Sequence, residues 1–308
     1  MAETILDVKD LSVSFRMYNP QSLEQKNLRV INNLSVQVKE GEIVAVAGAS
    51  GSGKSLLAHA ILGILPANAA VTGNMTYYGK ALTPELQKSL RGKELALVPQ
   101  SITYLDPLMR VGKQVTGIYG GTEKQRSLFQ RYGLGEDAEG LFPFQLSGGM
   151  ARRILLATAV MGEARLIIAD EPTPGMSADM ARRAMGHFRE LAEAGAGILL
   201  ITHELDLAFE YADSIAVFYA GTTVEIAPAS DFKLSADTLR HPYSKALWQA
   251  LPQNGFVPVP GSQPYAGNPP IGCAYAPRCP RRTASCESED PIPMREMRNG
   301  EVRCIHAV

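Results

Sequence analysis

The sequence of 308 residues has no long apolar run and no block of like charge. Its longest apolar runs, such as residues 154–160, are far shorter than the about 20 residues of a membrane-spanning helix. The 30 Lys and Arg balance 31 Asp and Glu, and no basic block predicts a nucleic-acid partner. Residues 1–10 are mixed and carry three carboxylates, unlike a signal peptide. We therefore expect a cytoplasmic protein that reaches a membrane only through partners.

Cysteine is scarce and absent before position 273. The four cysteines follow the spacing C-x5-C-x6-C-x17-C, which is not the paired C-x2-C of common zinc ribbons. Their clustering, in a chain expected in a reducing compartment, favours metal or cluster ligation over disulfides.

A glycine-rich loop is the strongest signal in the chain. Residues 48–55 read Gly-Ala-Ser-Gly-Ser-Gly-Lys-Ser and fit G-x-x-x-x-G-K-[ST], between an apolar run at 42–47 and a helical pattern at 56–62. A flexible Gly/Ser turn is the alternative, but the flanking strand and helix argue against it. Converging backbone N–H groups and a helix N-terminus suit a polyphosphate. We predict that these residues bind a nucleotide, which the family resemblance described below implies to be ATP: Gly48, Ser50, Gly51, Ser52, Gly53, Lys54, Ser55 and Leu56.

Strand and helix patterns alternate after this loop and predict a parallel sheet. Apolar runs that finish in polar residues occupy 95–100, 166–171 and 197–203. Helical patterns cover most of 111–161 and 180–194. Alternating strands at 4–16 and 28–38 predict antiparallel β structure before the loop. Chemistry is expected where parallel strands end. Polar residues stand at these ends: Gln100, Asp170, Glu171 and His203.

The pair Asp170-Glu171 follows an apolar run, as in a Walker B strand. Asp170 would hold Mg²⁺, with Lys54 on the β- and γ-phosphates and the Ser55 hydroxyl as a further Mg²⁺ ligand. Glu171 would orient and polarise the attacking water. Alone, the pair could be a solvated strand end.

The order of the motifs resembles that of the ABC transporter ATPases. It runs from the loop at 48–55 through Gln100, the Ser-Gly-Gly-Met at 147–150 and Asp170-Glu171 to His203. The resemblance covers about residues 4–251. It implies an α/β fold, a P-loop NTPase of ABC type, with a RecA-like core, an antiparallel β subdomain and a helical subdomain at about 105–163. Residues 252–308 would form a small C-terminal segment with the four cysteines.

The resemblance also implies roles for single residues. Glu171 and His203 would be catalytic, and Gln100 would contact ATP and Mg²⁺ and sense the membrane partner. Phe15 would stack on adenine, although a core strand residue is the equal alternative. The signature residues would face the ATP of a second subunit: Ser147, Gly148, Gly149 and Met150.

One position departs from the family. Ser177 stands where the D-loop usually has an aspartate, so a hydrogen bond is kept and a charge is lost. The departure suggests a heterodimer with unequal sites, and a tolerated substitution is the alternative.

Residues 241–251, beginning His-Pro-Tyr, resemble the oligopeptide/dipeptide/nickel importer branch. The branch implies a peripheral subunit at the cytoplasmic face of the inner membrane that couples ATP hydrolysis to uptake of peptides, nickel or metal chelates. Its partners would be a second ABC ATPase, two transmembrane permeases and, indirectly, a solute-binding protein. The cargo stays open.

Several dipeptide-type members of this branch carry a 4Fe-4S cluster in the corresponding segment. The resemblance implies four thiolate ligands here, Cys273, Cys279, Cys286 and Cys304, with a zinc site or free thiols as alternatives. Two other functions are alternatives to import. A soluble, non-transport ABC ATPase would usually have a coiled-coil insertion or two nucleotide domains. A redox-sensing ATPase fold without catalysis would not need its intact Lys54 and Glu171.

Overall fold

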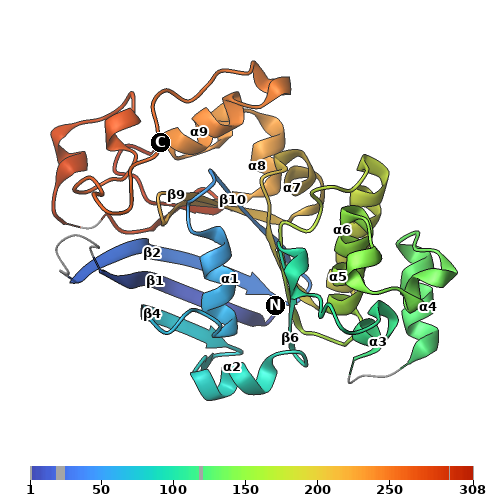
Figure 1. Cartoon of the computed structure of the whole chain (residues 1–308). Helices are drawn as coiled ribbons and strands as arrows, with labels where there is room; N and C mark the ends of the chain where they lie inside the picture. The colour runs from blue at the N-terminus through green and yellow to red at the C-terminus, as the bar shows by residue number, and fades with distance from the viewer. Residues whose placement is uncertain (1, 19–24, 118–120, 291, 308) are drawn as a thin grey trace.

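The N-terminal part of the chain forms an antiparallel sheet in the order β2-β1-β4-β5 (Figure 1). The computed structural model describes residues 2–18, 25–117, 121–290 and 292–307. The strands of this sheet are β1 (Thr4–Tyr18), β2 (Gln25–Lys39), β4 (Ala69–Tyr77) and β5 (Lys80–Ala81). β1 and β2 pair from Thr4 opposite Lys39 to Tyr18 opposite Gln25. The predicted antiparallel β structure before the P-loop is confirmed.

The larger sheet has the order β11-β12-β10-β9-β3-β8-β7-β6. Its strands are β3 (Ile43–Gly48), β6 (Leu95–Val98), β7 (Leu166–Asp170), β8 (Gly197–Ile201), β9 (Ser214–Tyr219), β10 (Thr222–Pro228), β11 (Arg295–Met297) and β12 (Gly300–Val302). The run from β9 to β6 is parallel. β7 and β8 are buried along their whole length, which explains their continuous apolar sequence. Because β8 lies between β3 and β7, the residues that follow these three strands meet at one edge.

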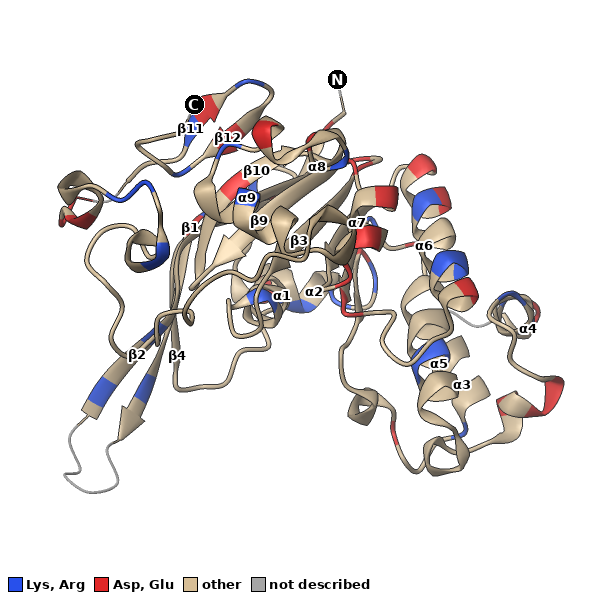
Figure 2. Cartoon of the chain, turned by 90° about the horizontal axis from the view of Figure 1, so that it is seen from above, with Lys and Arg blue, Asp and Glu red and all other residues tan. Residues whose placement is uncertain are grey.

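Helices cover both faces of this sheet (Figure 1). Their bounds are α1 (Lys54–Leu62), α2 (Pro84–Leu90), α3 (Val111–Thr116), α4 (Thr122–Arg131), α5 (Gly148–Val160), α6 (Ala178–Glu193), α7 (Leu205–Tyr211), α8 (Ala229–Leu234) and α9 (Pro242–Gln249). α3, α4 and α5 gather at one end, where the helical subdomain was predicted (Figure 1). Acidic and basic residues are interspersed along α6 (Figure 2). Within the described ranges, no helix is long and apolar enough to cross a membrane.

The C-terminal segment returns to the core sheet. After largely irregular chain, β11 and β12 form a hairpin, and β12 pairs with β10 through Glu301 opposite Ile226. The predicted division of the chain after residue 251 stays a prediction, but the strands beyond it extend the same sheet as the P-loop strand.

A buried ion pair holds this hairpin in place. Arg240 and Glu225 are 1% and 0% exposed, with Arg240 Nη1 3.2 Å from Glu225 Oε1 and 2.8 Å from Asp231 Oδ2. Arg240 Nε donates to the Met297 carbonyl oxygen at 2.8 Å in β11. The guanidinium therefore ties β10, α8 and the hairpin together.

We expect Arg240→Met to lower the free energy of unfolding by about 3–5 kcal/mol, because Glu225 is left as an uncompensated buried charge. Urea denaturation followed by circular dichroism measures it. The control is Arg282→Met, which removes an exposed ion pair with Glu287 and should cost less than about 1 kcal/mol. Equal, small effects from the two variants would contradict the structural role of Arg240.

Candidate functional site

The glycine-rich loop lies between the end of β3 and the start of α1, as predicted. Gly48 has φ +154°, and a Cβ there would lie 2.3 Å from the Phe218 carbonyl oxygen in β9. Only glycine therefore allows the loop to leave the sheet at this point. Gly53, at φ +94°, precedes the first turn of α1, so the helix N-terminus points its free N–H groups toward the loop.

Lys54 and Ser52 supply the polar groups inside the loop. Lys54 is 7% exposed, and its Nζ donates to the carbonyl oxygens of Gly48 at 2.8 Å and Ala49 at 3.0 Å. Burial lowers the Lys54 pKa, and Glu171 and Asp170 oppose this shift. Ser52 Oγ is buried and has no hydrogen-bond partner in the described part of the chain. An ammonium and an unpaired hydroxyl around converging N–H groups form a cradle for an anion.

Asp170 and Ser55 meet across the sheet edge. Asp170, at the end of β7, is 3% exposed and accepts a hydrogen bond from Ser55 Oγ at 3.2 Å. Burial raises the pKa of the Asp170 carboxyl. A carboxylate and a hydroxyl are oxygen ligands of the kind that Mg²⁺ prefers, so this pair fits the ion.

Glu171 brings two other predicted residues together. Its Oε2 accepts from Gln100 Nε2 at 2.8 Å, and its Oε1 lies 3.3 Å from His203 Nδ1. Glu171 has φ +49°, which is strained for a side chain of this size. With this backbone conformation, the Glu171 carboxylate contacts Gln100 and His203. In this arrangement the amide of Gln100 occupies an acceptor oxygen that a general base would need.

Arg152 was missed by the sequence reasoning. It lies on α5, and its Nη1 donates to the carbonyl oxygens of Gln100 at 2.7 Å and Glu171 at 3.0 Å. One guanidinium therefore fixes the backbone at two strand ends. The only signal was a pair of arginines in an otherwise apolar helix after the Ser-Gly-Gly.

The Ser-Gly-Gly begins α5, which stands apart from α1 in both views (Figures 1 and 2). Ser147 Oγ accepts from the Met150 N–H at 3.2 Å and caps the helix. A Cβ on Gly149 would lie 3.1 Å from the Gly175 carbonyl oxygen. The Ser-Gly-Gly therefore lies against the segment just before Ser177 in the same chain. Gly148 has open space where its side chain would be.

Ser177 caps α6 in the same way. Its Oγ accepts from the Met180 N–H at 3.3 Å, and the residue is exposed. Serine and aspartate are both good N-caps, so the substitution keeps the local structure and removes only the charge.

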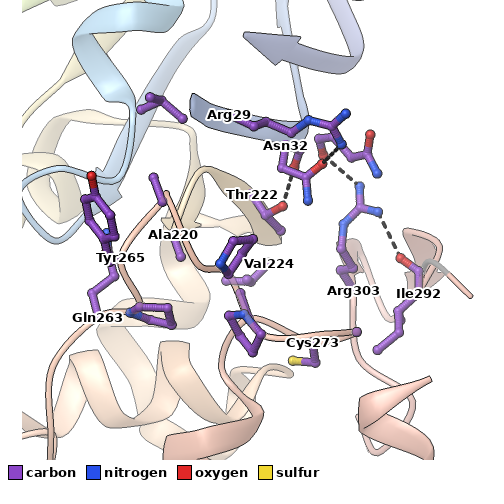
Figure 3. A pocket seen from close by; sticks show the side chains of 18 of the residues that line it. Arg29, Asn32, Ala220, Thr222, Val224, Gln263, Tyr265, Cys273, Ile292 and Arg303 are labelled. Atoms are coloured by element: carbon purple, nitrogen blue, oxygen red, sulfur yellow. Dashed lines mark hydrogen bonds between the residues drawn. The ribbon is translucent and has the colours of Figure 1, made fainter. Parts of the chain in front are cut away.

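Phe15 and Leu56 are partly buried against the core cluster between the small sheet and α1. Phe15 pairs with Leu28 in β2. A cleft of about 760 Å³ lies nearby, between β2, the P-loop and the C-terminal segment (Figure 3). Ser50 and Gly51 form one edge of it. Arg303 is held there by the carbonyl oxygens of Ile292 at 2.9 Å and Asn33 at 3.1 Å.

The C-terminal region contacts the P-loop directly. Tyr243, in the His-Pro-Tyr motif, is 3% exposed, and its hydroxyl lies close enough to the Ala49 backbone N–H for that group to oppose the effect of burial on its pKa. Burial raises the pKa of Tyr243 to about 12, so the hydroxyl stays protonated. Gln263 Nε2 donates to the Gly51 carbonyl oxygen at 3.4 Å. The His-Pro-Tyr motif, a family marker in the sequence, therefore lies beside the loop at 48–55, and Gln263 bonds to that loop.

The four cysteines line one small cavity, together with His241 and His306. None is in a disulfide, and burial raises the pKa of the Cys273, Cys279 and Cys304 thiols. As placed, no group of three or more His, Cys, Asp or Glu among the described residues is arranged to hold a metal ion. The four thiols expected to hold an iron–sulfur cluster or zinc therefore surround one cavity. They are not placed as ligands of a single metal ion.

Two family models match the chain. The ABC transporter model matches residues 31–174, and the model of the oligopeptide/dipeptide transporter C-terminal region matches 224–286. The chain is 31% identical over 312 residues to the oligopeptide transport ATP-binding protein OppD of Escherichia coli (strain K12), covering 94% of this chain and 90% of that protein. It is 33% identical over 309 residues to the dipeptide transport ATP-binding protein DppD of the same strain, covering 93% and 92%.

Solved structures share the fold. An ATP-binding subunit of an ABC transporter is 27% identical with a TM-score of 0.60, over 74% of this chain and 92% of that one. A dimeric bacterial ABC transporter cassette has a TM-score of 0.63 at 22% identity, over 73% and 99%, which supports the fold alone. The fold class and the ATPase expected from the sequence are confirmed. The chain belongs to the ATP-binding subunits of ABC transporters, in the oligopeptide/dipeptide group.

We expect Arg152→Gln to lower the turnover number for ATP by about 10-fold or more, since a small displacement of a catalytic group is costly. The KM for ATP should change little, because Arg152 does not touch the P-loop. Steady-state ATPase kinetics of the assembled transporter measure both. Arg183→Gln, which removes an exposed ion pair with Asp179 on α6, is the control. A rise in KM with unchanged turnover would contradict a positioning role.

Proposed function

We propose that the protein is the ATP-hydrolysing subunit of an ABC importer for oligopeptides or dipeptides. The observation that carries this proposal is the joint match of the ABC model and the oligopeptide/dipeptide C-terminal model, with relatives that match over most of their length. Two relatives are named for oligopeptide and dipeptide transport. Peptides are therefore favoured as the cargo over the nickel and metal chelates that were also expected from the sequence. No observation favours a non-transport or redox-sensing ATPase.

ATP binds with its phosphates in the loop at 48–55 and its base toward Phe15. Lys54, released from the loop carbonyls, pairs with the β- and γ-phosphates. Ser55, Asp170 and Gln100 hold Mg²⁺, which supplies charge neutralisation at the phosphates when bound. Glu171 takes a proton from the attacking water once the Gln100 amide has left its carboxylate. His203 Nδ1, now against Glu171, turns to the γ-phosphate.

A second ATPase subunit completes the site. Ser147, Gly148, Gly149 and Met150 face the ATP of the partner, and the partner's signature faces the P-loop of this chain. The N-terminus of α5 provides N–H groups for that contact. A capped but uncharged D-loop at Ser177 supports a heterodimer of unequal sites, since one charge is missing from the coupling between them.

The permease subunits dock on this chain from the cytoplasmic face of the membrane. A groove of about 340 Å³ separates the sheet edge from the helical end and is lined by the end of α1, β6, α3 and α5. Leu62, Leu97 and Val115 give it an apolar surface. Because β6 leads into Gln100, a helix seated in this groove displaces the residue that occupies Glu171. The solute-binding protein meets the permeases on the other side.

Uptake by a deletion strain tests this function. We expect the wild-type gene to restore uptake of radiolabelled di- or oligopeptides but not of radioactive nickel. Glu171→Gln should bind ATP yet lower uptake by about 100-fold or more, because the general base is lost. The exposed Glu296→Gln should behave as wild type. Restored uptake of nickel would identify nickel, and not peptides, as the cargo. Peptide uptake that does not depend on the gene would refute a role in import.

The cysteine segment holds a 4Fe-4S cluster in this proposal, with zinc as the alternative. The donor set fits in kind, since four thiols surround one cavity. The buried His241 Nε2 also lacks a partner among the described atoms, as expected of a donor whose acceptor belongs to a bound group. Cys273, Cys279, Cys286 and Cys304 would be the ligands after small side-chain shifts. When bound, the cluster cross-links the C-terminal segment and can change its charge by one electron.

Purification without oxygen tests the cluster. We expect a brown protein with about four irons and four sulfides per chain. Cys279→Ser should lower the iron content, because one thiolate is lost. Iron, sulfide and zinc are measured on the same sample. A colourless protein with one zinc per chain would contradict the cluster, and a metal-free protein would contradict both cofactors.

A further inference from the structure

The orientation of the His241 ring is set by the helix that it caps. His241 is 1% exposed and immediately precedes α9, and its Nδ1 accepts a hydrogen bond from the Tyr243 N–H at 3.0 Å. The backbone N–H of His241 donates to Glu225 Oε2 at 2.8 Å. Since Nδ1 accepts, the neutral ring carries its proton on Nε2.

That Nε2–H is buried and has no acceptor among the described residues. Buried donors are rarely left unpaired in proteins, and each exception needs an explanation. The other histidine at the same cavity is different, because His306 Nε2 is already bonded to Thr283 Oγ1 at 2.8 Å. The His241 ring, which lines the cavity of the four cysteines, therefore has a donor without an acceptor.

We infer that His241 donates its Nε2–H to a sulfur of the group that the four cysteines hold. The inference rests on the proposed cluster and concerns a residue beyond its ligands. A hydrogen bond to sulfur stabilises the more negative, reduced form of an iron–sulfur cluster, so His241 raises its midpoint potential. His241 is a positioning and tuning residue, not a ligand.

Two substitutions separate this role from helix capping. His241→Asn keeps an N-cap oxygen for α9, but its side chain is too short to place a donor where Nε2 lies. His241→Gln is long enough to place an N–H near that point but lacks the preferred cap. His306→Gln is the control at the same cavity.

The experiment is a reductive titration of the anaerobically purified full chain, followed by absorption and electron paramagnetic resonance, with iron and sulfide counted in each sample. We expect a more negative midpoint potential for His241→Asn at unchanged iron content. His241→Gln should return toward the wild-type potential despite its weaker cap, and His306→Gln should match wild type. If His241→Asn loses the cluster, retention by His241→Gln supports the inference equally.

A wild-type potential in His241→Asn would overturn the inference alone. Equal shifts, or equal cluster loss, in the Asn and Gln variants would also overturn it, since capping would then be the cause. A wild-type protein with zinc or without metal would overturn the proposed cluster and this inference together.

Discussion

The convergence of three parallel strand ends is the constraint on which the site depends. β8 lies between β3 and β7, so the P-loop, the carboxylate pair and His203 reach one edge of the sheet. The strands can do this because they are apolar on both faces and buried there by helices and the small sheet. Glu171 takes a strained backbone conformation at this edge, and Arg152 holds its carbonyl oxygen in place. The ends of the buried strands thus carry the groups that must be positioned closely, and Arg152 on α5 helps to position them.

Much of this arrangement could be predicted from the sequence because its signals are local. The glycine pattern at 48–55 and the carboxylates after an apolar run each lie on a few consecutive residues, and parallel-sheet topology joins them. Contacts made through backbone atoms could not be predicted in this way. Arg152 binds two carbonyl oxygens, which every residue has, so its partners leave no mark in the sequence. The pairing of β12 with β10 joins residues far apart in a chain rich in Gly and Pro, where short strands give weak signals.

Serine at two helix starts shows how one residue serves both fold and function. Ser147 and Ser177 each cap a helix through the side-chain oxygen, and each occupies a motif that we propose to face a second subunit. Capping explains why serine is stable there, but not why two glycines follow Ser147, since glycine weakens a helix. The two glycines after Ser147 are therefore the part of the motif that points to a ligand. For Ser177 no such excess exists, so its departure from aspartate has no structural cost.

Tyr243 lies near the Ala49 N–H and Gln263 donates to the Gly51 carbonyl oxygen, so the C-terminal region adjoins the loop at 48–55. Tyr243 lies two residues from His241, at the cavity of the four cysteines. Thermodynamic linkage between two such sites is reciprocal. A group bound in that cavity could shift α9 and so change the affinity of the loop for nucleotide by some factor. Nucleotide binding would then change the affinity of the cavity for that group by the same factor. The affinity of the transporter for nucleotide would then depend on the state of its four cysteines.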